Sequence, residues 1–508
     1  MFALIQANGL LVSKVKTFKE IFLDFLAVES NVFHFDKSDA LEKLYGTTKD
    51  PQFTSLLGRK LASVCISLNE HPSIRYQGSS PYAKDIATSL HQTILSYKRN
   101  NPSFWTYGDD NIHHERERGQ ILILDRSFDC LSPLMHEYTY QAMANDLLNV
   151  EDGVISYTTT TNKGTEEKQA VLNESDEFWL ELRHSHIAKV IEVIKERMND
   201  IIQNNSGAAL AKKSGADLDI TAMAAAVKKL PEYTQTMTKL GQHVAIAQQC
   251  MDAFSKQGLL DLSQVEQTIS TGLDEEFKEV KGSKLLTLVT ETLKKNLKKE
   301  QRIRLLAIYF VSQKNVPGSE EHIQLALQAS KLSESEKVVF TNFTRLLGAP
   351  EVISTAPGAA KGGVFSFFGG KTTKHSPTPE GEYADTRHVC LLKILLEQIM
   401  SNTLPMEKFP AIGPAAANTT KTEAKSVRKF GAASKFGKKD HIQLSGVRYM
   451  CFVAGGVSYA ELRSGYEMMQ KESKEVIIGG THLITPESYL VDVGALNSGR
   501  TTNREDLI

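Results

Sequence analysis

The stretch QILILDRSFDCLSPLMHEYTYQAMANDLL, residues 120–148, decides the fold of this 508-residue chain. Its apolar run Ile121–Leu124 is short and unbroken, which is typical of a strand buried on both faces of a parallel sheet. Charged residues end the run, and Ser132-Pro133 then offers a helix cap followed by a first-turn proline. Apolar residues recur at helical spacing beyond it, at Leu134, Tyr138, Ala142 and Leu147. The stretch therefore predicts a strand, a charged corner and a helix.

Three charged side chains lie at the predicted corner: Asp125, Arg126 and Asp129. One interpretation is a ligand site, because open α/β sheets bind small molecules at the carboxyl ends of their strands. The alternative is that these side chains pair with one another and cap the corner. We favour the second interpretation, since a single charged corner is more often structural than functional.

Composition narrows the class of protein. The length predicts roughly three domains, and a formal net charge of -1 gives no reason to expect a nucleic-acid partner. The five cysteines show no C-x-x-C spacing, which predicts reduced, mostly buried thiols in a cytosolic protein. No apolar run approaches the roughly 20 residues that span a bilayer, and residues 1–16 lack the basic segment of a signal peptide. We therefore expect the chain to reach membranes only through a partner.

The two ends of the chain have α/β character and the middle is helical. Residues 447–454, 458–470 and 476–478 read as strand, helix and strand, and such a unit usually lies in a parallel sheet. The predicted fold is α/β plus all-α: an open, mainly parallel sheet with a large helical domain inserted. The sheet domain is discontinuous and takes residues 23–129 and 400–508, whereas residues 130–399 form the insertion.

A helical hairpin is expected at about residues 176–255, inside the insertion. Residues 176–202 carry apolar side chains at helical spacing, and a second long helix follows from Ile220 after a small, polar loop. Pro231 lies within the second helix and should bend or break it, because proline lacks a backbone donor and clashes with the preceding turn. The remainder of the insertion, residues 259–347, is predicted to be helical throughout.

The spacing of the histidines does not favour a metal site, and the spacing of the glycines does not favour a nucleotide site. His113-His114 are adjacent, and His184 and His186 are two residues apart on a predicted helix, so the members of each pair point in different directions. Gly370-Lys371-Thr372 lacks the earlier glycine and the preceding strand that a phosphate loop requires. We expect no catalytic residue, no cofactor and no metal.

Two segments have the composition of loops. Residues 355–381 are rich in Gly, Pro, Ser and Thr and are predicted to form a flexible linker. Residues 415–439 are small, polar and basic. They would suit contact with acidic lipid headgroups or a phosphorylated partner, and the alternative, which we favour, is a solvated loop.

The motif D-R-x-x-D-x-x-S-P-x-x-H-E-x-T-x-Q-A-M-x-x-D-L-L, which begins at Asp125, resembles the signature of the SM family. These Sec- and Munc-type syntaxin-binding proteins guide SNARE assembly in membrane fusion. Residues 176–190 (DEFWLELRHSHIAKV) and 452–486 (FVAGGVSYAELRSGYEMMQKESKEVIIGGTHLITP) are similar to later segments of the family. The resemblance spans nearly the whole chain and is closest to the plasma-membrane secretory branch.

The resemblance implies an arch-shaped, monomeric, non-enzymatic regulator of vesicle docking and exocytosis, present in the cytoplasm and recruited peripherally to the plasma membrane. Its implied partners are a syntaxin-type SNARE, the assembled SNARE complex and, as a further candidate, a vesicle SNARE. Met198 and Val244 align with apolar positions on the two hairpin helices, and Pro231 with the hinge. A partner helix would meet such positions through regularly spaced apolar anchors, whereas core packing is the alternative role for Met198 and Val244.

The resemblance also bears on the first residues. SM proteins open with a complete α/β domain, and this sequence begins at the tail of that domain, so residues 1–22 are expected to be its remnant. Four positions align roughly with the surface that holds the N-terminal peptide of syntaxin: Phe2, Val15, Phe18 and Glu20. Packing onto the next domain is the alternative role for these residues.

Two other classes of function were weighed. An α/β enzyme that binds a nucleotide or small molecule at strand ends would need a phosphate loop, a nucleophile elbow or paired acids with a histidine. A helical cytosolic adaptor would be favoured by a repeat of fixed period, and the sequence shows no such repeat. We therefore favour the SNARE-binding regulator.

Overall fold

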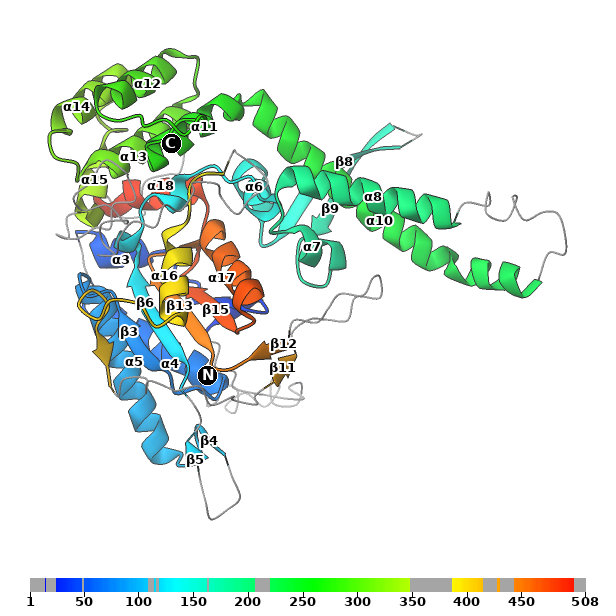
Figure 1. Cartoon of the computed structure of the whole chain (residues 1–508), viewed down its shortest axis with the longest axis horizontal. Helices are drawn as coiled ribbons and strands as arrows, with labels where there is room; N and C mark the ends of the chain where they lie inside the picture. The colour runs from blue at the N-terminus through cyan, green and yellow to red at the C-terminus, as the bar shows by residue number, and fades with distance from the viewer. Residues whose placement is uncertain are drawn as a thin grey trace.

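The computed structural model describes residues 14, 24–47, 50–107, 114–115, 118–161, 164–205, 220–347, 386–413, 427–429 and 443–497. Figure 1 shows a body built around a sheet, a group of helices beside it, and a long pair of helices that projects from the body. Within the described residues, no helix has both the length and the hydropathy needed to cross a membrane.

The central sheet has seven strands in the order β1-β2-β15-β13-β6-β3-β10. The five inner strands are mutually parallel, whereas β1 and β10 pair antiparallel at the two edges. The strands are β1 Leu26–Glu29, β2 Val32–His34, β3 Ser73–Tyr76, β6 Gln120–Asp125, β10 Ala411–Ile412, β13 Tyr449–Ala454 and β15 Val476–Gly480. The predicted sheet, built from the two ends of the chain, is confirmed.

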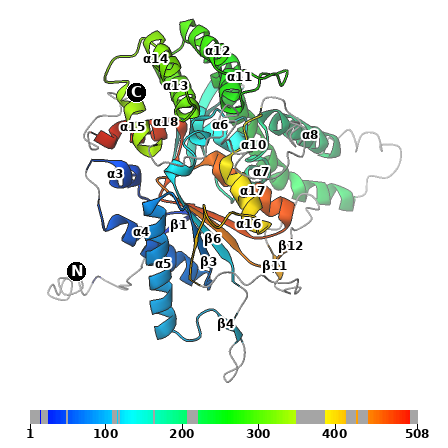
Figure 2. The ribbon, with the colours of Figure 1, turned by 60° about the vertical axis from the view of Figure 1, so that its left-hand side comes forward.

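Strand β6 lies inside the sheet between β13 and β3. Ile121 and Ile123 join the apolar cluster on one face, and Leu122 and Leu124 join the cluster on the other face. Helices α4 (Phe53–Ser67) and α5 (Pro81–Asn100) supply the first cluster, and α16 (Leu391–Met400) and α17 (Tyr459–Glu472) supply the second (Figure 2). An unbroken apolar run is needed here because each side chain of Ile121–Leu124 meets a hydrophobic layer.

The C-terminal βαβ unit is also confirmed. Strand β13 leads through Gly455-Gly456, both at positive φ, into α17, and β15 returns parallel to β13. A capping box between Ser458 and Glu461 starts α17. Thr485 caps α18 (Pro486–Gly494), which has its proline in the first turn as the sequence predicts.

The insertion contains most of the remaining helices. They are α6 Tyr140–Leu147, α7 Glu177–Leu182, α8 Ile187–Asn205, α10 Ile220–Lys256, α11 Leu259–Thr271, α12 Ser283–Lys294, α13 Lys299–Gln313, α14 Glu320–Ala329 and α15 Val338–Leu347. The largest apolar cluster joins them to one another. Helix α3 (Ala40–Tyr45) lies near α18 at the boundary with the sheet.

The helix predicted to start at Ser132-Pro133 starts later. These residues form the short 3-10 helix η2 (Ser132–Leu134), and α6 begins only at Tyr140. His136 is held by Glu266, 130 residues away, through both its backbone N–H (3.2 Å) and its Nδ1 (2.8 and 2.9 Å). The carbonyl of Tyr138 accepts from Ile187 N at 2.8 Å. These long-range bonds hold the segment outside a helix, so the predicted start was wrong.

The single helix predicted over residues 176–202 is two helices, α7 and α8, with a break between them. The break is fixed from outside, because Tyr140 N donates to Ser185 O (3.0 Å) and Gln141 N to Arg183 O (2.8 Å). Two backbone carbonyls at the break therefore satisfy the first turn of α6. Asp176 caps α7 with bonds to two backbone N–H groups.

An antiparallel sheet replaces the purely helical texture expected after Cys130. It consists of β7 Val150–Glu151, β8 Val154–Thr161 and β9 Gly164–Val171. The β7–β8 turn is Asp152-Gly153, with both residues at positive φ, which suits a two-residue hairpin turn. This dipeptide and the β-branched run at residues 158–161 are local signals in the sequence that favour the sheet.

Helix α10 continues through position 231, so the predicted break at Pro231 is wrong. A proline removes one hydrogen bond of the helix and leaves the bonds of the other turns in place, and contacts of α10 with α8 and α6 support the remainder. A bend at this position stays a prediction.

Several predicted features lie outside the described residues. They are Phe2, Val15, Phe18 and Glu20, the linker 355–381 with Gly370-Lys371-Thr372, and His113. Part of the basic segment 415–439 is described: β11 (Val427–Lys429) pairs antiparallel with β12 (Gln443–Ser445). All five cysteines are free and buried, as predicted.

Candidate functional site

The charged side chains at the end of β6, Asp125, Arg126 and Asp129, all make contacts within the protein. Asp125 accepts from the backbone N–H (2.8 Å) and the hydroxyl (2.5 Å) of Ser127. Asp129 accepts from Leu131 N and Ser132 N, both at 2.9 Å. Both carboxylates are buried. These contacts support the capping interpretation, because the carboxylate groups are already engaged by the turn that they stabilise.

Arg126 pairs with Glu461 in the first turn of α17. Two guanidinium nitrogens donate to the two carboxylate oxygens at 2.9 and 2.6 Å, and neither side chain is exposed. Burial opposes the charge of Arg126, but Glu461 outweighs it and raises the pKa of the guanidinium above its usual value. A β-carbon on Gly455 would come within 2.9 Å of the Arg126 Cβ. The glycine therefore makes room for this pair.

Ser132, His388 and Asp129 form a chain of hydrogen bonds that differs from a hydrolytic triad. Ser132 Oγ donates to Asp129 Oδ2 at 2.5 Å, and His388 Nε2 lies 2.9 Å from the same hydroxyl. Because the single hydroxyl proton goes to Asp129, His388 must donate to Ser132 and does not act as its base. In a triad the histidine stands between serine and acid. The arrangement gives no support to the enzyme alternative.

Asp129, Cys390 and Glu461 place potential metal-ligand atoms within 4.8 Å of one another. The oxygens of Glu461 are engaged by Arg126, and burial raises the pKa of the Cys390 thiol well above its usual value. A fixed guanidinium and a protonated thiol do not fit a cation site. His184 and His186 are also apart: His184 packs on Tyr466 (4.6 Å between ring centroids) and His186 on Tyr138 (5.5 Å).

The base of the hairpin is built around His243 on α10. Its Nδ1 lies 3.0 Å from the hydroxyl of Tyr140, and its Nε2 lies 3.4 Å from Asp176 Oδ1 at the start of α7. Burial works to raise the pKa of Asp176, but the hydrogen bond and charge of His243 and the nearby Lys239 lower it below its usual value. These contacts fix the base of the hairpin against α6 and α7.

The two hairpin residues singled out by resemblance have different surroundings. Met198 on α8 is half-buried and packs on the large apolar cluster, next to the stripe of Val190 and Ile194. Val244 lies beside the buried stripe of α10, and 41% of its surface is exposed. Only Val244 therefore presents a freely accessible apolar side chain. Pro231 lies in a part of α10 whose side chains are not described.

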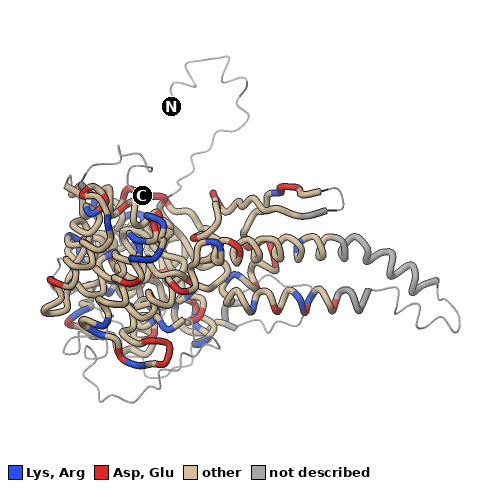
Figure 3. Tube along the Cα trace, turned by 90° about the horizontal axis from the view of Figure 1, so that it is seen from above, with Lys and Arg blue, Asp and Glu red and all other residues tan. Residues whose placement is uncertain are grey.

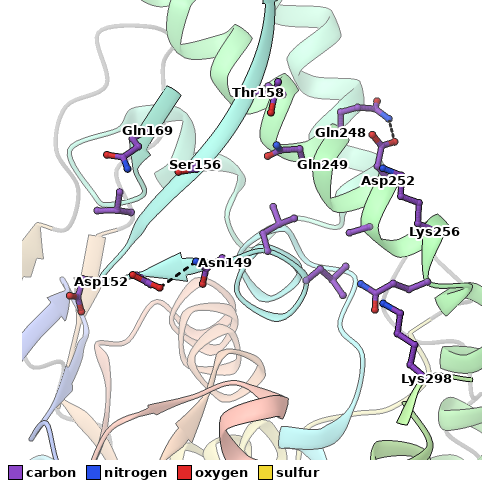
Figure 4. Close-up of a pocket in the computed structure, with 17 residues that line it drawn as sticks. Asn149, Asp152, Ser156, Thr158, Gln169, Gln248, Gln249, Asp252, Lys256 and Lys298 are labelled. Carbon is purple, nitrogen blue, oxygen red and sulfur yellow. Dashed lines mark hydrogen bonds between the residues drawn. The ribbon is translucent and has the colours of Figure 1, made fainter. Parts of the chain in front are cut away.

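Beside Val244, a groove runs between the C-terminal half of α10 and the β7–β8–β9 sheet. It encloses about 1060 Å³, and Figure 4 shows side chains from α10 and from β8 and β9 facing it. Sequence reasoning missed this groove because it missed the sheet that forms its floor. We call it the α10–β8 groove; its lining includes Asn149, Ser156, Thr158, Gln169, Gln248, Gln249, Asp252, Lys256 and Lys298.

Charge is mixed over the described surface. Figure 3 shows Lys and Arg interspersed with Asp and Glu over the body and along α8 and α10. This distribution agrees with the near-zero net charge of the sequence. A partner is therefore recognised by the shape and local chemistry of one face more than by a long-range electrostatic field of the whole molecule.

The described residues thus form a mainly parallel sheet with an inserted helical region and a projecting pair of helices, and the charged corner of the sheet is engaged in internal contacts. Comparison with known proteins is specific: the model of the Sec1 family matches residues 3–492. The chain belongs to the Sec1 family.

Relatives match almost the whole chain. "Protein transport protein sec1" of Dictyostelium discoideum is 32% identical over 497 residues, covering 95% of this chain and 78% of that protein. The "SNARE-interacting protein KEULE" of Arabidopsis thaliana is 27% identical over 99% of this chain and 80% of that protein.

Solved structures agree with the fold. The Unc18 chain of the Unc18-syntaxin 1 complex from Monosiga brevicollis superposes with a TM-score of 0.72 at 26% identity, over 98% of this chain and 81% of that one. The SM protein Vps45 in complex with the Qa SNARE Tlg2 gives a TM-score of 0.68 at 18% identity, over 94% and 77% of the two chains.

Proposed function

We propose that this chain is a non-enzymatic SNARE-binding regulator of vesicle docking and fusion. The observation that carries the proposal is the Sec1-family match across residues 3–492, with relatives named for protein transport and SNARE interaction. Solved neighbours are complexes with syntaxin 1 and with a Qa SNARE. By this proposal the chain binds a syntaxin-type SNARE and the assembled SNARE complex, and it templates or stabilises assembly, with a vesicle SNARE as a further partner.

The mechanism needs no bond chemistry. A SNARE segment that is not yet helical must pay the cost of helix nucleation before it can pair, and bringing several chains together costs translational and rotational freedom. A rigid surface that holds two partners in register lowers both costs before the helices zip together. Two features support a scaffold over a catalyst. The charged groups of Asp125, Arg126 and Asp129 are bonded within the protein, and Ser132 donates its proton to Asp129 and not to a histidine.

The hairpin is the proposed binding element, with Val244 as its exposed apolar anchor. A partner helix would contact Val244 and continue along α10 through positions three, four and seven residues away. The role of Met198 is proposed to be support of this surface, given its packing on the core, and Pro231 is proposed as the hinge. The N-terminal residues Phe2, Val15, Phe18 and Glu20 stay a prediction for the syntaxin N-peptide.

The proposed place of action is the cytoplasmic side of the plasma membrane, reached through its SNARE partners. The Sec1 and Unc18 relatives support this location. We also propose the division into residues 1–22, 23–129 with 400–508, and 130–399. In this division α16 (Leu391–Met400) is grouped with the sheet domain, because it packs on the sheet, so the proposed boundary at residue 400 moves to a point before Leu391.

The test is calorimetric titration of the purified chain with the cytoplasmic part of a plasma-membrane syntaxin and, separately, with an assembled SNARE complex. A dissociation constant in the micromolar range or below for either would support the proposal. Folded protein that binds neither would overturn it. Circular dichroism of the same sample distinguishes a lack of binding from a lack of folding.

A further inference from the structure

The α10–β8 groove differs from an ordinary small-molecule pocket in both size and lining. Its volume of about 1060 Å³ lies at the upper end of the range of such pockets, which are mostly apolar and hold a few polar groups. Here seven of the seventeen lining residues carry an amide or a hydroxyl group, among them Gln248 and Gln249 on α10 and Ser156, Thr158 and Gln169 on the sheet, and five are apolar. A polypeptide is the ligand that suits a long groove lined in this way, because amides can both donate to and accept from a backbone.

The two lysines of the groove lie together at one of its ends. Glu151 ends β7 and Asp152 begins the β7–β8 turn, whereas Lys256, the last residue of α10, and Lys298, just before α13, lie at the opposite end (Figure 4). A third lining carboxylate, Asp252, lies one turn before Lys256 and accepts from Gln248 at 2.9 Å. Both lysines are exposed, and among the described residues no ion pair joins either of them to a carboxylate. A ligand with an acidic side chain at the lysine end and a basic one at the turn would match this order.

One acceptor in the groove lacks a donor. The carboxamide oxygen of Gln249 is shielded from solvent and receives no hydrogen bond in the part of the chain that the structure describes. Such a buried acceptor is costly unless a partner satisfies it. A backbone N–H of an extended segment supplies that bond once the Gln249 carboxamide turns into the groove, since a helix uses most of its own N–H groups internally.

The groove is continuous with the proposed hairpin surface. Val244, Gln248 and Asp252 are spaced four residues apart on α10, so they lie along one face of the helix. Gln248 donates to Asp252 at 2.9 Å, which orders this face. A partner that covers Val244 can therefore extend into the groove without leaving α10.

We propose that the α10–β8 groove binds an extended, polar segment of the SNARE partner, with an acidic side chain over Lys256 and Lys298 and a backbone N–H directed to Gln249. This inference rests on the proposed function and assigns a second contact to it, separate from the apolar contact at Val244. The groove selects a partner by the positions of its hydrogen-bonding groups and charges. It therefore adds specificity for the SNARE partner, to which the small apolar surface at Val244 contributes little.

The test reverses charge at the lysine end. The double variant Lys256→Glu/Lys298→Glu is titrated in the full chain with the syntaxin cytoplasmic part and with the assembled SNARE complex. The matched control is Lys284→Glu/Lys294→Glu on α12, which makes the same charge change at two exposed lysines outside the groove. Wild type and both variants are measured at low and at high salt, because attraction between exposed charges is screened by salt.

For the partner that wild type binds, we expect the groove variant to weaken binding about tenfold at low salt and less at high salt, with the control within twofold of wild type. Equal effects of the two variants, or no effect of the groove variant, would contradict binding of the partner in the groove. Neither result would contradict the proposed function. Failure of wild type to bind either partner would overturn both. As a second probe of the groove, Gln249→Met keeps the side-chain length and removes the acceptor, and we expect it to weaken binding severalfold.

Discussion

Arg126 at the end of β6 and Glu461 in the first turn of α17 are 335 residues apart in the sequence and form a fully buried, two-point ion pair. The same carboxylate accepts from the backbone N–H of Ser458 at 2.7 Å. The guanidinium also donates to the carbonyls of Gly456 (3.0 Å) and Asp129 (2.6 Å). The pair therefore joins the two chain segments of the sheet domain across the whole inserted region.

Breaking this pair should be costly, because the partner left behind is a buried, uncompensated charge. We expect Arg126→Met to lower the free energy of unfolding by about 3 to 5 kcal/mol, measured by urea denaturation followed by circular dichroism. The double variant Arg126→Met/Glu461→Gln should lose less than the sum of the two single variants, since the orphaned charge is gone. Additive losses would show that the two side chains act independently.

The sheet could be predicted because its signals are local. Ile121–Leu124 faces apolar layers on both sides. Its neighbour β13, and β15 beyond it, come from a βαβ unit whose glycine turn and capping box are visible in the sequence. The long helices of the insertion carry apolar stripes of the same local kind. Their periodicity is enough to place them within a few residues.

What escaped prediction depends on distant partners. The segment before α6 is held outside a helix by Glu266. The break after α7 is held by Tyr140 and Gln141, which donate to the carbonyls of Ser185 and Arg183. The α10–β8 groove requires the β7–β9 sheet and α10 to meet, which no local pattern reports. Corner residues such as Asp125 were ambiguous for the same reason, since only the fold shows that their partners are internal.

A close approach at Gly479 on β15 gives a prediction for the sheet. A β-carbon at this position would overlap the ring of Phe33 on β2, so we expect Gly479→Ala to destabilise the protein by about 1 to 3 kcal/mol. The control is Gly241→Ala on α10, where no atom lies within 4 Å of the added carbon. That change should instead stabilise by about 0.5 to 1 kcal/mol through helix propensity. Thermal unfolding midpoints that shift in the same direction would contradict this account.

His184 should make stability fall in mild acid. Burial, with the charges of Arg183 and Arg463, lowers the pKa of His184 well below 6.5, and its Nε2 accepts from Arg183 Nε at 3.1 Å, which requires the neutral ring. Below pH 6.5 the unfolded chain therefore binds a proton that the folded chain does not. Stability contributed by this histidine is complete above pH 6.5 and falls by up to about 1.4 kcal/mol per pH unit until the folded pKa is reached.

The variant His184→Gln isolates this effect, because glutamine keeps an acceptor for Arg183 and does not titrate. We expect its free energy of unfolding, measured by urea denaturation from pH 7 to pH 5, to depend less steeply on pH than that of wild type. Parallel pH profiles of the two proteins would assign the acid sensitivity to other groups. His388, whose pKa burial also lowers, is unchanged in both proteins and contributes equally to each.

A substitution at Val244 tests partner binding by the hairpin without disturbing folding. Since 41% of its surface is exposed, Val244→Arg should leave the thermal midpoint unchanged while weakening binding to syntaxin or to the assembled SNARE complex at least tenfold, because a charge would replace an apolar anchor. Leu260→Arg is the matched control: it introduces the same charge at a side chain that is 51% exposed and lies on α11, not on the hairpin helix α10. Met198→Arg should instead lower stability and binding together, because Met198 packs on the core. Calorimetry in which Val244→Arg binds as wild type does, or in which Leu260→Arg loses as much affinity, would place the partner on a surface other than this face of α10.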